Sequence, residues 1–91
     1  MIIKLKENPH ISGPTYRLPT EDGHDSIYVL EGSWYEAPAV DADGNAYTVL
    51  WKILPDWDNE DESSACDWHK PVAIVQEAPW RDVTKIAELV F

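Results

Sequence analysis

The sequence predicts one α+β domain, residues 1–91, that is mainly β. We expect a small antiparallel sheet of four or five strands, with a long acidic loop between its third and fourth strands. Three observations predict this fold: short β-branched and aromatic runs, turn residues between them, and an acidic segment, Leu54–Pro71, bordered by two such runs. With 91 residues, 44% of them hydrophobic, the chain is long enough to bury one core.

The N-terminal part of the chain predicts one short strand and a long loop. In the run Ile2–Lys6, Ile3 and Leu5 alternate with two lysines, which is typical of a half-buried strand. From residue 7 to residue 25, three prolines and two glycines interrupt every hydrophobic period. Because proline lacks the N–H that a strand or helix needs, we expect a loop over residues 7–25.

The middle of the chain predicts a β-hairpin that ends in the central strand. Residues 26–36 are rich in aromatic and β-branched side chains, and Asp41–Asn45 is a tight-turn sequence because Asp and Gly accept left-handed backbone. The run Ala46–Leu54 is apolar on both faces, so we expect it to be covered on both sides. One face carries Tyr47, Val49, Trp51 and Ile53, and the other carries Leu50 and Leu54.

The C-terminal part predicts a fourth strand and an ambiguous end. Residues 72–77 form a β-branched run that follows Pro71, where a missing N–H costs least. Residues 79–84 have the composition of a turn. Residues 85–91 fit both a helical stripe and strand alternation, and we interpret them as a helical turn that leads into a last strand.

The net charge of the chain limits the classes of molecule that it can bind. Seventeen acidic residues against seven basic residues give a net charge of -10, which repels nucleic acid and anionic membranes and attracts basic partners. The N-terminal residues do not resemble a signal peptide, and we expect a cytoplasmic protein. The single cysteine, Cys66, excludes an internal disulfide, so the fold does not require an oxidising compartment.

The acidic loop, residues 54–71, is the strongest candidate for a binding surface. It holds six acidic residues against one basic residue, which is half of the net charge, together with two of the five tryptophans. In an extended chain, alternate carboxylates would line one side about 7 Å apart, like a phosphate backbone. Tryptophan is a favoured interface anchor. The predicted partner-binding residues are Asp56, Trp57, Asp58, Glu60, Asp61, Glu62, Asp67 and Trp68. The competing interpretation is a solvated loop whose tryptophans fold back onto the core.

The sequence supports metal binding and catalysis less well than it supports partner binding by the acidic loop. The Asp41–Asn45 turn lacks the oxygen ligands that an EF-hand loop places at its first and twelfth positions, and the acidic loop has no glycine to wrap around an ion. Cys66 and His69, together with His24, offer three zinc ligands, or a thiol and a base, but no orienting group is evident. We therefore predict no catalytic residue, no metal site and no cofactor, and keep a divalent-metal protein or small enzyme as an alternative.

These observations together predict a small, acidic, non-enzymatic protein-binding module. In its sharpest form it is an inhibitor that mimics nucleic acid and occupies the groove of a basic nucleic-acid-processing enzyme, by analogy of charge and size with phage anti-defence and nuclease-immunity proteins. The acidic loop is the expected contact, with the Asp41–Asp43 turn as an additional acidic site. A structural or assembly subunit is the third hypothesis.

Overall fold

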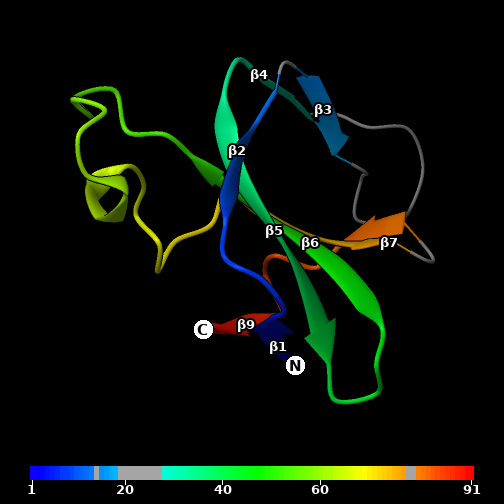
Figure 1. Ribbon diagram of the computed structural model, residues 1–91. Coiled ribbons are helices and arrows are strands. Elements are labelled where there is room, and N and C mark those ends of the chain that lie inside the picture. Colours follow the sequence, from blue (N-terminus) through cyan, green and yellow to red (C-terminus); the bar gives the residue numbers. More distant parts are fainter. Residues whose placement is uncertain (14, 19–27, 78–79) are drawn as a thin grey trace.

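The computed structural model describes residues 1–13, 15–18, 28–77 and 80–91, and it is mostly β (Figure 1). Among these residues there is no α-helix, only a short 3-10 turn, so the α part of the predicted fold class is wrong there. The elements are β1 Ile2–Leu5, β2 His10–Ser12, β3 Thr15–Leu18, β4 Tyr28–Glu31, β5 Trp34–Asp41, β6 Ala46–Lys52, the 3-10 turn η1 Glu62–Ser64, β7 Ala73–Glu77, β8 Trp80–Asp82 and β9 Glu88–Val90.

The main sheet is larger than predicted and is mixed. It has seven strands in the order β8-β7-β6-β5-β1-β9, with β2 also paired to β5, while β3 and β4 form a separate two-stranded sheet. The strands pair antiparallel except β1 and β9, which run parallel and bring the two ends of the chain together. The prediction of four or five antiparallel strands is therefore wrong, because very short strands add to both edges.

Two of the added strands lie in the predicted loop over residues 7–25. β2 pairs with the first half of β5, from His10 opposite Glu36 to Ser12 opposite Trp34, and β1 pairs with the second half of the same edge. β3 pairs with β4. Each of these strands is only three or four residues long, so each fits between two prolines. The rest of that predicted loop, residues 14 and 19–25, lies outside the described residues.

The central strand is confirmed. Tyr47, Val49 and Trp51 of β6 lie in the larger core cluster on one face of the sheet. Leu50 lies on the other face, with Trp34 of β5 and two residues of β7. β6 is therefore covered on both faces, as its apolar pattern predicts. No helix of the described residues is long and apolar enough to cross a membrane.

The predicted hairpin is confirmed for β5 and β6, and Asp41 organises its turn. The earlier part of its predicted first strand differs, because β4 pairs with β3 in the other sheet, and residues 26–27 lie outside the described residues. β5 and β6 pair antiparallel from Trp34 opposite Lys52 to Val40 opposite Ala46. The carboxylate of Asp41 accepts hydrogen bonds from the backbone N–H groups of Asp43 and Asn45 and from the Tyr47 hydroxyl, at 2.9, 3.0 and 2.8 Å. The Asn45 side chain also donates to this carboxylate, and its bond has the largest effect on the pKa. Together these bonds lower the pKa of Asp41 from 3.8 to about 2.

This shift predicts an acid-sensitive hairpin. Because the folded state holds Asp41 ionised, its contribution to stability is present above about pH 4 and is lost as the pH falls towards 2. We expect Asp41→Asn to be less stable than wild type at pH 7 and to lose less stability between pH 4 and pH 2. Urea unfolding at a series of pH values measures this, with Asp43→Asn as the matched control. Parallel curves for wild type and Asp41→Asn would contradict the assignment.

Candidate functional site: the acidic loop and its cleft

The acidic loop leaves the sheet after β6 and returns to it at β7 (Figure 1). Its first residue is tied to its second half, because the backbone N–H of Leu54 donates to the carbonyl of Ala65 at 2.7 Å. Within the loop, η1 begins after Asp61, whose side chain caps it by accepting from the backbone N–H of Ser63 at 3.0 Å. Ala65 and Cys66 are buried in the larger core cluster. The loop is therefore a folded part of the domain.

Trp68 is the main anchor of the loop. Its indole N–H donates to the carbonyl of Ser63 at 3.0 Å, and its own carbonyl accepts from the indole N–H of Trp51 at 3.1 Å. The Trp68 ring also packs edge-to-face against Tyr35 and Trp51, with ring centroids 5.2 Å apart in both cases. Such pairs favour one geometry beyond their buried area. Trp68 therefore joins the loop to β5 and β6 at once.

Trp57 is a second anchor. Its indole N–H donates to the carbonyl of Asp61 at 2.9 Å, and its ring packs edge-to-face against Tyr35 at 6.1 Å. Both tryptophans that the sequence analysis assigned to the partner surface are partly buried against the core. Their first role is to hold the loop on the sheet, as the competing interpretation expected, and only their remaining exposed surface is open to a partner.

Three of the loop's aspartates are used in turns. Asp58, Asp61 and Asp67 each accept a hydrogen bond from the backbone N–H two residues later, at 3.0, 3.0 and 3.3 Å. Asx turns of this kind bend the chain. The bonds from Ser63 lower the pKa of Asp61. Asn59 has a positive φ of 67°, which also breaks an extended conformation. The predicted straight row of alternating carboxylates is therefore wrong.

The other three acidic residues of the loop are exposed, and they differ in their hydrogen bonds. Asp56 and Glu60 are exposed, and their carboxylates make no hydrogen bond within the described part of the chain. Glu62 accepts a hydrogen bond from the Tyr35 hydroxyl at 2.9 Å. Burial of Tyr35, followed by this bond and the Glu62 charge, raises the Tyr35 pKa to about 12. The Tyr35 hydroxyl thus stays protonated and holds one oxygen of Glu62 in place.

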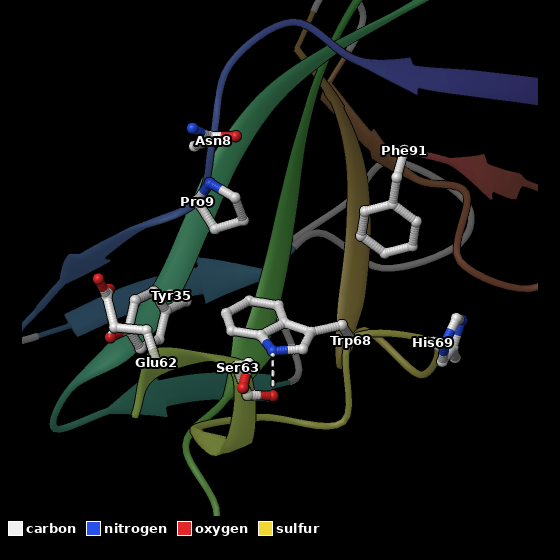
Figure 2. A pocket seen from close by; sticks show the side chains of 8 residues that line it. All are labelled: Asn8, Pro9, Tyr35, Glu62, Ser63, Trp68, His69 and Phe91. Atoms are coloured by element: carbon white, nitrogen blue, oxygen red, sulfur yellow. Dashed lines mark hydrogen bonds between the residues drawn. The ribbon is translucent and has the colours of Figure 1, made fainter. Parts of the chain in front are cut away.

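A cleft of about 510 Å³ opens beside the loop, and Trp68 lies at its centre (Figure 2). Tyr35 and Glu62 lie on one side of the indole and Phe91 on the other, with Pro9 above it in this view. These residues come from β5, the acidic loop, the C-terminal end and the β1–β2 connection. The lining residues are Asn8, Pro9, Tyr35, Glu62, Ser63, Trp68, His69 and Phe91. A second cleft, of about 460 Å³, shares Trp68, His69 and Phe91.

The sequence pattern does not predict this cleft. Glu62 and Trp68 are among the predicted partner-binding residues, but the other walls come from segments that are far apart in the sequence. The alternation of Ala87, Leu89 and Phe91 was the only signal that pointed the last residue towards the same face as the core. Which segments meet there depends on the parallel pairing of β1 with β9, which no short motif encodes.

Within the described part of the chain, Cys66 and His69 make no hydrogen bond to each other. Cys66 is buried, with 4% of its surface exposed, and burial raises the pKa of its thiol to about 11. His69 is exposed and stacks edge-to-face on Phe91 at 5.9 Å. No group of three or more His, Cys, Asp or Glu residues in the described ranges could hold a metal ion. His24, the third ligand of the zinc alternative, lies outside the described residues.

Because the Cys66 thiol is buried and its pKa is raised, we expect it to react slowly with thiol reagents. The thiolate is the reactive species, so we expect Cys66 to react with a thiol reagent such as Ellman's reagent at least about 100-fold more slowly in the native protein than in urea. Absorbance at pH 8 measures both rates, with free cysteine as the reference. A native rate close to that of free cysteine would show that the thiol is accessible and would reopen a nucleophilic role.

Comparison with protein-family models, curated proteins and solved structures found no significant match to this chain.

Proposed function

We propose that this protein is a small, non-enzymatic binding module that acts in the cytoplasm and uses the acidic loop to occupy a basic surface on a protein partner. The observation that supports this most is the way the loop carries its charge. Two indoles and three Asx turns hold it against the sheet, and Asp56 and Glu60 still point into solvent. A loop that is ordered before binding loses little entropy on association, so more of the contact energy appears as affinity.

The sharpest form of this proposal is a nucleic-acid mimic that blocks the groove of a nucleic-acid-processing enzyme. Such grooves are lined by Lys and Arg, and a net charge of -10 attracts them over distances of about 10 Å. The mimic here is a bent, folded surface instead of the straight row that the sequence suggested. It resembles nucleic acid in charge, and electrostatic steering would act mainly on the association rate.

The Asp41–Asp43 turn lies at the opposite end of β6 from the acidic loop. The turn precedes β6 and the loop follows it, so the two lie at opposite ends of a seven-residue strand. At about 3.3 Å per residue this separates them by roughly 23 Å. The turn therefore serves as a control position.

Charge reversal tests the proposal. We expect Asp56→Lys with Glu60→Lys to slow association with the partner at least about tenfold at low salt. Both side chains face solvent, and their carboxylates make no hydrogen bond to any residue that the structure describes. Affinity capture from a lysate of the source cells, at low and at high salt, identifies the bound proteins by mass. Added salt should release the partner from wild type.

The matched control is Asp43→Lys with Glu77→Lys, which changes the net charge by the same amount at exposed positions outside the loop and outside both clefts. The proposal expects this control to capture the partner as wild type does. Capture of the same basic protein by the loop variant and by wild type would remove the loop from the function. If both variants captured equally less partner, the loss would be due to the change in net charge and not to the loop.

A further inference from the structure

The cleft beside the acidic loop combines aromatic rings with one carboxylate. Tyr35, Trp68 and Phe91 contribute the rings, and Glu62 lies at the edge beside Tyr35 (Figure 2). Among the described residues that line this cleft, Glu62 is the only acidic one, and none is a lysine or an arginine. Phe91 is 56% exposed, so its ring is available to a ligand.

Glu62 is positioned to receive a cation. One of its oxygens, Oε2, already accepts from the Tyr35 hydroxyl, which fixes the carboxylate at the edge of the cleft. The structure gives the other oxygen, Oε1, no partner among the described residues. A carboxylate with one oxygen held and one open can accept a further charge-assisted hydrogen bond from a ligand.

The aromatic walls select among cations. A cation is attracted to the face of an indole or phenol ring, and the planar guanidinium group of arginine also stacks on such rings. Because guanidinium is more weakly hydrated than ammonium, it loses less on entering an apolar cleft. An anion is disfavoured by the net charge of -10, and a purely apolar side chain would give Oε1 of Glu62 no hydrogen-bond donor.

We propose that this cleft binds an arginine side chain of the protein partner, with the guanidinium stacked on Trp68 and hydrogen-bonded to Glu62. This inference rests on the proposed function and deepens it, since it names the partner residue that anchors the contact. The acidic loop attracts a basic surface, and the cleft selects arginine over lysine within that surface.

Short peptides test the cleft without the partner. The probes are capped pentapeptides, Gly-Ser-X-Ser-Gly, in which X is arginine, lysine, citrulline or leucine. Citrulline keeps the shape of arginine and removes the charge. Titrations followed by the tryptophan indole N–H signals in ¹H–¹⁵N NMR report which ring each peptide touches. Trp34 lies in the core cluster on the other face of the sheet and is the internal reference.

We expect the arginine peptide to shift the Trp68 signal, to leave the Trp34 signal in place, and to bind at least about fivefold more tightly than the other three peptides. Glu62→Gln should weaken arginine binding at least about fivefold and leave leucine binding unchanged, because glutamine still accepts from Tyr35. Phe91→Ala, at an exposed position that the fold does not need, should weaken it as well.

Equal binding of the arginine and citrulline peptides, or a Trp68 signal that does not respond, would overturn the cleft proposal. This failure is distinguishable from failure of the proposed function. Loop-dependent capture of a partner together with equal binding of the peptides would keep the function and remove the arginine site. Selective arginine binding together with capture that is insensitive to the loop charges would keep the site and remove the loop.

Discussion

Trp51→Ala is expected to destabilise the domain by about 3–5 kcal/mol, the usual cost of truncating a buried aromatic side chain. Trp51 is completely buried in the central strand, and its indole N–H donates to Trp68. A domain of this length has a total stability of about 5–14 kcal/mol. The variant should therefore be partly unfolded at 37 °C, or have a Tm lower by at least about 12 °C.

Urea unfolding followed by circular dichroism measures this loss without relying on the fluorescence that the substitution removes. Trp80→Ala is the matched control, because Trp80 is 44% exposed on an edge strand and the same truncation should cost less than about 1.5 kcal/mol there. A cost for Trp51→Ala no larger than that of the control would contradict the position of β6 at the centre of the core.

Trp68→Ala is expected to release the acidic loop and to destabilise the domain by about 2–3 kcal/mol. The cost is smaller than for Trp51 because Trp68 is only partly buried, but it removes two ring contacts and the hydrogen bond to Ser63. The backbone N–H groups of Leu54 and Ala65, which the loop protects, should then exchange with solvent much faster than those of the β6–β7 ladder.

Hydrogen exchange followed by NMR resolves the two groups of amides. Trp68→Phe keeps a ring against Tyr35 and loses the indole donor, so it should retain most of the protection. If Trp68→Ala left the exchange of Leu54 and Ala65 unchanged, the loop would be held by something other than this indole. Faster exchange should be accompanied by weaker partner binding at constant charge, because a mobile loop pays its ordering entropy on association.

The centre of the sheet could be predicted from the sequence, and its edges could not. β6 shows apolar residues on both faces over seven residues, and the Asp41–Asn45 turn has the composition that such turns require. β2 and β3 are too short to show a period, and prolines flank them. β5 continues through Pro38 because this residue lies between the part of β5 that pairs with β2 and the part that pairs with β1, where no described strand needs its missing N–H. Its carbonyl accepts from the backbone N–H of Lys6 at 2.9 Å.

The charge of the candidate site was visible in the sequence, whereas its shape was not. Composition alone places Asp56, Glu60 and Glu62 in one acidic loop. The sequence does not show that Trp57 and Trp68 turn inward. Their orientation depends on ring contacts with Tyr35 and Trp51, which lie on the sheet. Sequence patterns report local periods, and the cleft arises from contacts between segments that are distant along the chain.

The most direct test of the central claim is a competition measurement on the captured partner. A fluorescently labelled duplex is bound to the partner, and its anisotropy is followed as the protein is added. The proposal predicts release of the duplex near one equivalent of wild type and of the Asp43→Lys with Glu77→Lys control. It predicts that Asp56→Lys with Glu60→Lys requires at least about tenfold more protein. A duplex that stays bound while the protein occupies the partner would contradict it.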